Sequence, residues 1–332
     1  MTAIYLTKSG VTLTAKGRVF ELWHRDQLQS RVQAKMTSHI VAFAGCSVAP
    51  TAAALASSHY LPLLFLDAAG RYVGRLPLTP PTKYLPLQQQ RAKDGEFVLT
   101  TALGIVNATL HSRLALLAMI SGDGCSRMRM AMGEIESRQE QIATGNLETL
   151  RGNLAAVNQL YYPLLRRWLW QHTAWENDFL DHLFHLNHAL LEQIIYGFVM
   201  EWGLAPDIAC LHVGDRDKLP LVQDLMLEWS TPLVDAVVMR FALTDHPCPH
   251  NGNGNSVYHW RERFIAAWEQ QLKTIVTGDK SLRQLLWHQV GCYCQTLRGD
   301  TSYYPALVKW NSIPMFQLPP KNWSHSQALA LL

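Results

Sequence analysis

His212, Asp224 and Glu228 are the residues whose types and spacing best fit metal-dependent chemistry. His212 closes the apolar segment 208–211, Asp224 stands at the start of the next predicted helix, and Glu228 follows one turn later on the same face. An imidazole with carboxylates can hold Mg²⁺ or Mn²⁺, which prefer oxygen ligands and tolerate one nitrogen. Such an ion could polarise a phosphodiester and activate water or a 3′ hydroxyl. The competing interpretation is structural: His212 ends a helix–loop junction, Asp224 caps a helix and Glu228 is solvated.

A second group contains soft ligands. His246, Cys248 and His250 precede Cys292 and Cys294 in the chain, and nitrogen and sulfur donors in that number could close a tetrahedral zinc site. Their spacing matches no common zinc motif, and the segment continues into the polar stretch 251–255. A flexible polar loop is therefore the alternative interpretation.

Basic side chains could contact phosphates, and tryptophans lie among some of them. The candidate DNA-binding residues are Arg113, Arg166, Arg167, Lys273 and Arg283. Trp168, Trp170 and Trp175 surround the central pair and could stack on frayed bases. Trp168 and Trp175 are also spaced for one helical face, which favours a place in the core.

The elements that must position these residues divide the chain in two. Short runs rich in β-branched and aromatic residues predict strands, and a run of small residues predicts one short helix, 52–58. The predicted strands are 3–6, 12–15, 19–22, 40–43, 62–67 and 72–76. Two adjacent prolines at 80–81 cannot continue a strand ladder. We therefore expect a β-rich N-terminal dimerisation domain over residues 1–78 and a linker over 79–96.

Beyond the linker, apolar residues recur at helical spacing. The predicted helices are 97–120, 129–143, 147–169, 179–202, 223–241, 260–276 and 282–297. They form an expected helical domain over residues 97–310, followed by a Pro-rich flexible tail over 311–332. The predicted fold class is α+β, with a small β-sandwich-like domain followed by a larger all-helical domain.

Composition restricts the class of protein more than its partner. Hydrophobic residues make up 48% of the chain and charged residues 17%, which indicates a globular protein rather than a disordered one. The net charge of +3 permits nucleic-acid binding without requiring it. No signal sequence or uninterrupted apolar membrane span is evident, and the scattered cysteines suit a reducing compartment. We expect a cytoplasmic protein with no membrane partner.

The order of these features resembles the adaptation integrase family of CRISPR systems, the "Cas-one" family. The resemblance runs from Ala3 to about Trp310 and is most specific between Leu190 and Asp235, where a Gly-Leu-Ala-Pro segment precedes a His and a Leu-x-x-Asp-Leu-Met segment follows it. The resemblance implies a Glu, a His and two acids around one divalent ion. It assigns the His to His212 and the first acid to Asp224.

Two of the family's ligand positions hold leucine. The segment that resembles Leu-Arg-Gly-Ile-Glu places Leu154 at the position of the Glu, and the second acid falls on Leu227. Glu228 is adjacent and could substitute if the helix is shifted, because a one-residue insertion precedes Pro232. Leucine offers no lone pair to a dication, so we expect Mg²⁺ or Mn²⁺ to bind weakly or not at all.

The resemblance also implies how the protein works. We expect a catalytically impaired subunit that binds and scaffolds protospacer DNA, duplex or branched, for integration into the CRISPR array. It would act as a homodimer, or as a heterodimer with an intact paralogue, together with a small ferredoxin-like "Cas-two" protein. One alternative is an active metal-dependent endonuclease or integrase that uses His212, Asp224 and Glu228. The second alternative is a purely structural partner protein.

Overall fold

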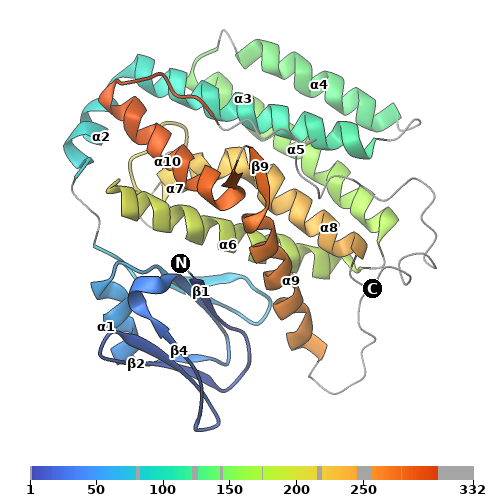
Figure 1. The fold of residues 1–332 in the computed structure, drawn as a ribbon. Coiled ribbons are helices and arrows are strands. Elements are labelled where there is room, and N and C mark those ends of the chain that lie inside the picture. Colours follow the sequence, from blue (N-terminus) through green and yellow to red (C-terminus); the bar gives the residue numbers. More distant parts are fainter. Residues whose placement is uncertain are drawn as a thin grey trace.

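The computed structural model describes residues 2–79, 83–121, 126–142, 145–173, 175–214, 219–244, 256–277 and 279–305. Figure 1 shows a β-rich N-terminal region at one end of the molecule and a helical region covering it. Helix α6 (Asn177–Trp202) lies directly beside the β-rich region. The α+β class and its order along the chain are as predicted.

The first sheet has the order β1-β5-β7-β8. Strand β1 (Thr2–Leu6) and strand β7 (Leu63–Leu66) both pair in parallel with β5 (Thr37–Phe43), and β8 (Tyr72–Arg75) closes the sheet antiparallel to β7. Helix α1 (Pro50–Ser58) lies between β5 and β7 in the chain. This sheet therefore contains four of the six predicted strands.

The second sheet has the order β4-β3-β2-β6. Its members are β2 (Val11–Lys16), β3 (Val19–His24), β4 (Gln27–Gln33) and the short β6 (Ser47–Val48). Strand β4 was not predicted, because it is largely polar and exposed and has no alternating pattern. It forms by antiparallel pairing along the whole of β3.

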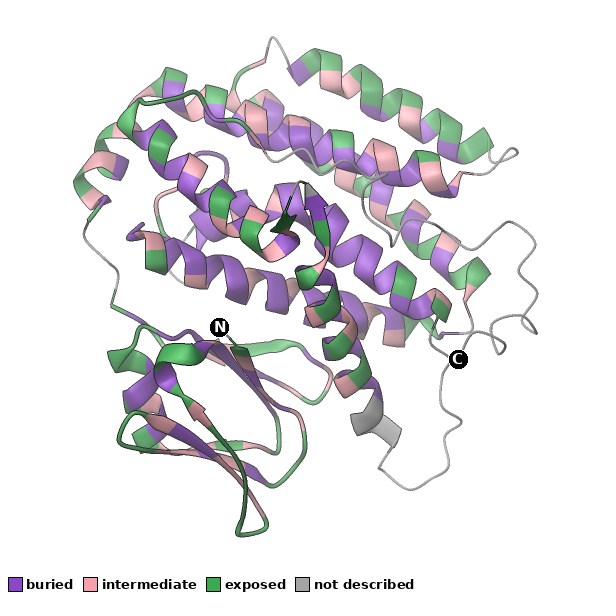
Figure 2. Ribbon diagram, in the orientation of Figure 1, coloured by how far each residue is buried: buried purple, intermediate pink, exposed green. Residues whose placement is uncertain are grey.

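Side-chain alternation along β5 joins two hydrophobic cores. Ile40 and Ala42 pack with the second sheet and α1, whereas Val41 and Phe43 pack with the helices. Successive side chains of a strand point to opposite faces, so both faces of the first sheet are covered. Figure 2 shows the consequence, since the buried residues continue from the sheets into α6. An ion pair between Arg75 and Glu192 adds a polar link between β8 and α6.

The helical region contains all the predicted helices and one short addition, α2 (Leu85–Arg91). Its remaining members are α3 (Gly95–Ile120), α4 (Ser126–Ile142), α5 (Leu147–His172), α6, α7 (Pro220–Trp229), α8 (Ala236–Thr244), α9 (Ser256–Lys273) and α10 (Leu282–Arg298). A short antiparallel pair, β9 (Ile275–Thr277) and β10 (Lys280–Ser281), separates the last two helices. The domain is therefore largely helical and not all-helical as predicted, and the helix predicted over 260–276 ends at Lys273.

Local chemistry explains several helix ends. The Asp94 side chain accepts a hydrogen bond from the backbone N–H of Phe97, and Asn146 does the same for Thr149, so these residues cap α3 and α5. Helix α6 ends at Gly203, whose φ of +85° is a left-handed conformation that glycine adopts without strain.

Helix α3 is a central helix of the core. Among the described residues it is the one helix that is long and apolar enough to cross a membrane by length and composition, but 56% of its most apolar stretch is buried inside the protein. It packs against α5 and α7. Packing against these neighbouring helices therefore explains why α3 is so apolar.

The predicted helix 223–241 is continuous but contains a π-helical turn over Ser230–Asp235. The sequence predicts a one-residue insertion just before Pro232, and a π turn holds one residue more than an α turn. The π turn is consistent with that predicted insertion, and α7 and α8 lie on either side of it.

Candidate metal-type site

The loop 208–214 encloses the carboxylate of Asp224. Oδ1 of Asp224 accepts a hydrogen bond from the His212 backbone N–H at 2.8 Å and lies 2.8 Å from His212 Nδ1. Oδ2 accepts from the backbone N–H groups of Cys210 and Leu211 at 2.8 and 2.9 Å. Asp224 is only 1% exposed, so these four donors replace water. Both oxygens of this carboxylate are thus engaged by the protein itself.

The contact with Asp224 determines which nitrogen of His212 faces outward. When Nδ1 donates to the carboxylate, Nε2 of a neutral imidazole carries the free lone pair. The side chain is 35% exposed, so Nε2 is the atom through which it can meet a ligand. Carboxylates commonly orient metal-binding histidines in this manner from behind the ligand shell. Asp224 is accordingly placed to orient His212.

The two leucines that the sequence analysis predicts at ligand positions lie in apolar surroundings. Leu154 is buried on α5 and belongs to the main helical core, and Leu227 is half-buried against the same core. Arg151, one turn before Leu154, donates from Nε to the Leu211 carbonyl oxygen at 2.6 Å. This bond attaches α5 to the loop that carries His212. The sequence analysis gave Arg151 no role, although it lies in the Leu-Arg-Gly segment.

Glu228 has a different environment from Asp224. It is buried and accepts a hydrogen bond from the hydroxyl of Tyr303, which also accepts from Gln289 of α10 at 2.7 Å. In the part of the chain that the structure describes, no group of three or more His, Cys, Asp or Glu residues is arranged to hold a metal ion. The structure therefore brings His212 and Asp224 together but does not join Glu228 to them as a third ligand.

A third buried carboxylate lies further along the same helical run. Asp235, in the π turn, accepts a hydrogen bond from the Tyr161 hydroxyl at 2.7 Å, and Arg113 lies nearby. Burial raises the pKa of Asp235 to about 7, although Tyr161 and Arg113 act in the opposite direction. Asn187 of α6 donates to the carbonyl oxygens of Leu233 and Val234, which supports the turn. Sequence reasoning did not identify this cluster.

The candidate DNA-binding residues lie in different places. Arg166 and Arg167 are exposed near the end of α5, and Lys273 is exposed at the end of α9. Arg283 is half-buried on α10. Arg113 is buried, with its guanidinium carbon 5.1 Å from the centre of the Tyr161 ring. A phosphate at the surface of this chain cannot reach Arg113, so we leave it out of the DNA-binding proposal below.

Arg166 and Arg167 line a small cavity of about 310 Å³ with Trp170, Asn177 and Asp181. Trp170 is 59% exposed, and its face is the aromatic surface available there. Arg166 is paired with Asp181 at 2.8 Å. Trp175 is buried and stacks on Phe179, so it lies in the core, but it follows the end of α5 at His172 and does not share a helical face with Trp168.

The predicted zinc ligands are only partly described. Cys292 and Cys294 lie on α10, where burial raises the pKa of the Cys294 thiol to about 11. His246, Cys248 and His250 lie outside the described residues. The zinc interpretation therefore remains a prediction.

Comparison with known proteins identifies a family. The model of the family described as "CRISPR associated protein Cas1" matches residues 4–246. A CRISPR-associated endonuclease Cas1 from Thermus thermophilus is 24% identical over 307 residues, which cover 89% of this chain and 95% of the relative. One from Mycobacterium tuberculosis is 28% identical over 182 residues, which cover 52% and 53%.

Solved structures share the fold. A CAS1 protein from Thermotoga maritima superposes with a TM-score of 0.74 at 18% identity, covering 92% of this chain and 100% of that one. A casposase bound to an integration product gives 0.72 at 13% identity and 100% and 99% coverage. A Cas6-RT-Cas1–Cas2 complex gives 0.77 at 15% identity, covering 92% of this chain and 36% of that one, so the chain spans about a third of its length.

Proposed function

The chain belongs to the Cas1 family of CRISPR adaptation proteins, and we propose that it binds and scaffolds protospacer DNA without carrying out strand transfer itself. Structural neighbours include a Cas1–Cas2 complex and a casposase with its integration product, which supports DNA and a small Cas2 protein as partners. We propose that it acts as a dimer, with itself or with an intact paralogue. The four described cysteines are free thiols, which suits the cytoplasm.

The engagement of Asp224 is the observation that carries the proposal. Family members are typically metal-dependent. Mg²⁺ and Mn²⁺ require several oxygen donors, and Asp224 could supply one only by giving up backbone N–H partners. At the family's other two acid positions, Leu154 and Leu227 supply none. Of the predicted ligand positions, Nε2 of His212 then remains as the available donor. A single nitrogen does not fit a resident divalent ion.

The alternative of an active enzyme needs Glu228 as a ligand. Glu228 is buried and hydrogen-bonded by Tyr303, so it would have to leave that partner and move toward His212. Burying a carboxylate without a compensating partner costs several kcal/mol. These two requirements favour the scaffolding function.

The alternative of a purely structural protein does not explain the surface of Arg166, Arg167 and Trp170. Two guanidinium groups beside an exposed indole match the backbone and the bases of an unpaired strand. This surface supports DNA contact that does not depend on a metal.

The proposal is tested by restoring the missing ligand. Leu154→Glu returns a carboxylate to the position that the resemblance gives to the family's Glu, one turn after Arg151, whose side chain bonds the loop of His212. Mn²⁺ should therefore stabilise this variant, by about 2.7 kcal/mol at 100 times the dissociation constant. Mn²⁺ should leave the melting temperature of the unmodified protein unchanged. Leu154→Gln is the matched control, because it adds polarity without a charge. Calorimetry in Mn²⁺ and in EDTA measures the difference.

Integration assays on the same samples give the functional result. The unmodified chain with a Cas2 partner should integrate no DNA, and it should enter an active complex when an intact Cas1 is added. Metal-dependent integration by the unmodified chain that is lost in His212→Ala would overturn the proposal in favour of a working site. His212 is the better position for this test, because its exposed ring can be removed with less damage to the fold than Asp224.

DNA binding is measured separately on the same protein. Affinity should fall steeply with salt and be nearly independent of sequence. Arg167→Ala should reduce the salt slope by about one phosphate contact, and Arg166→Ala by less, because Arg166 is already paired with Asp181. No salt-dependent binding at all would favour the purely structural alternative.

A further inference from the structure

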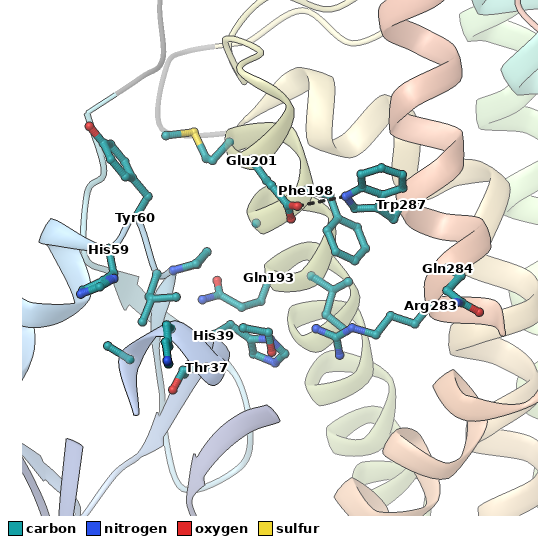
Figure 3. A pocket seen from close by; sticks show the side chains of 18 of the residues that line it. Thr37, His39, His59, Tyr60, Gln193, Phe198, Glu201, Arg283, Gln284 and Trp287 are labelled. Carbon is teal, nitrogen blue, oxygen red and sulfur yellow. Dashed lines mark hydrogen bonds between the residues drawn. The ribbon is translucent and has the colours of Figure 1, made fainter. Parts of the chain in front are cut away.

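A cavity of about 690 Å³ lies between the β-rich region and the helices α6 and α10. Its walls come from both parts of the chain: β5 and the segment 59–62 on one side, and the two helices on the other. Figure 3 shows side chains from these elements pointing into the same space. This volume is typical of a small-molecule site. His212 does not line the cavity, so the cavity is separate from the candidate metal-type site.

Gln193 of α6 lines this cavity and is fully buried. Neither its Oε1 nor its Nε2 has a hydrogen-bond partner among the described residues. A buried amide without partners is unfavourable, and native proteins rarely keep one without a reason. The amide offers one acceptor and one donor side by side, so its natural partner presents a donor next to an acceptor.

Positive charge lies around the same space. Arg283 of α10 is half-buried, and Lys35 lines the opposite side. In Figure 3 the guanidinium of Arg283 points toward His39 and Gln193. Glu201, which accepts a hydrogen bond from Trp287 Nε1 at 3.2 Å, sets one negative charge against these two positive charges. The cavity therefore favours an anionic ligand.

His39 forms part of the cavity wall and has no free ring nitrogen. The Tyr5 hydroxyl donates to Glu269 at 2.6 Å, so its oxygen is left to accept from Nε2 of His39 at 3.4 Å. Nδ1 lies 3.1 Å from the Ser38 hydroxyl. Burial, with the nearby Arg283, lowers the pKa of His39 to about 3, so the ring is neutral. His39 is therefore not available to a ligand, whereas Gln193 and Arg283 are.

We propose that this cavity binds an adenine nucleotide, with the base on Gln193 and the phosphate on Arg283. The amide of glutamine forms two hydrogen bonds with adenine, accepting from N6 and donating to N7. A guanidinium is well suited to phosphate. Ile194, Phe198 and Pro62 supply apolar walls for the base. The nucleotide is either free in solution or part of a DNA strand, and the two sources have this chemistry in common.

Calorimetric titration of the metal-free protein tests the proposal. AMP should bind more tightly than the monophosphate of purine riboside, which lacks the N6 donor, and adenosine should bind about tenfold or more weakly than AMP because it lacks the phosphate. Arg283→Gln should lower the affinity for AMP to that for adenosine and leave adenosine unchanged.

Gln193→Met should weaken AMP binding by about tenfold or more. Methionine has a similar volume and removes the unpartnered polar atoms, so the variant should fold at least as stably as the parent. Gln271→Met is the matched control, because Gln271 of α9 is also buried with an unpartnered amide but does not line the cavity. It should bind AMP like the unmodified protein.

Single-stranded oligonucleotides that contain or lack adenine distinguish the two sources. Binding of AMP itself identifies a free nucleotide as the ligand. Binding of only the adenine-containing strand, lost in Gln193→Met, assigns the cavity to a nucleotide within DNA. Equal affinity for AMP and for purine riboside monophosphate, binding of neither AMP nor the adenine-containing strand, or no effect of Gln193→Met would overturn the proposal. Because no metal or integration partner is present, this outcome is independent of the scaffolding function.

Discussion

Two buried aspartates on one helical run have opposite environments. Asp224 near the start of α7 receives three backbone N–H donors and the ring of His212. Asp235, in the π turn, receives the hydroxyl of Tyr161 at 2.7 Å and lies near Arg113, and burial raises its pKa to about 7. The comparison shows that burial alone does not determine what a carboxylate does. The number and rigidity of its donors do.

The difference assigns a role to each residue. Asp224 holds the loop 208–214 and orients His212, because the backbone N–H groups that surround its carboxylate have fixed orientations. Asp235 lies among side chains and is half-protonated near neutral pH, so it stabilises the core mainly in its neutral form. Each assignment can be broken by a substitution.

The largest effect is expected at Asp224. Asp224→Ala leaves three buried N–H groups without an acceptor, so the free energy of unfolding should fall by about 3–5 kcal/mol. Urea denaturation followed by circular dichroism measures this loss. His212→Ala, which leaves the backbone bonds in place, should cost far less. Equal losses in the two variants would mean that the carboxylate serves mainly the imidazole.

An intermediate effect is expected for the pH dependence at Asp235. Its pKa is about 7 in the folded protein and 3.8 ordinarily, so between these values the folded protein keeps a proton that the unfolded chain releases. Its contribution to stability is therefore fully present below about pH 4 and is lost as pH rises toward 7, by up to about 1.4 kcal/mol per pH unit.

Asp235→Asn removes this titration, so the stability of the variant relative to the parent should increase from pH 4 to 7 and then level off. Buried His39 and His188, with pKa values lowered to about 3 and about 4, produce the opposite slope in both proteins. The difference between the two unfolding curves removes their contribution. A difference that is constant with pH would contradict the raised pKa.

The smallest effect is expected at Tyr161. Tyr161→Phe removes one hydrogen bond, so it should cost about 1 kcal/mol. Because that bond lowers the pKa of Asp235, its loss should move the titration of Asp235 to higher pH. Tyr162→Phe, which lacks the direct bond to Asp235, is the control. NMR titration measures the pKa of Asp235 in both variants. An unchanged pKa in Tyr161→Phe would show that Tyr161 does not influence the ionisation of Asp235.

Periodicity in the sequence predicted most helices and strands. Apolar residues that recur at every second position share one face of a strand, and those that recur every three or four positions share one face of a helix, and burial of that face fixes the element. The same spacing could not predict β4, whose polar residues are ordered by pairing with β3. The sequence predicts an insertion before Pro232, and the structure has a π turn at that place. The apolar residues at Leu154 and Leu227 were visible as well.

The amino-acid sequence by itself determined the two-part α+β fold and the family, and it predicts leucine at two of the family's ligand positions. Only the tertiary structure decided which donors surround each remaining group. Asp224 meets the N–H groups of a loop far from it in the helix, Glu228 meets Tyr303, and Arg113 is enclosed by aromatic rings. Gln193 faces a cavity that exists because β5, α6 and α10 meet there. Hydrogen bonds and burial depend on neighbours in space, and spacing along one helix carries no information about them.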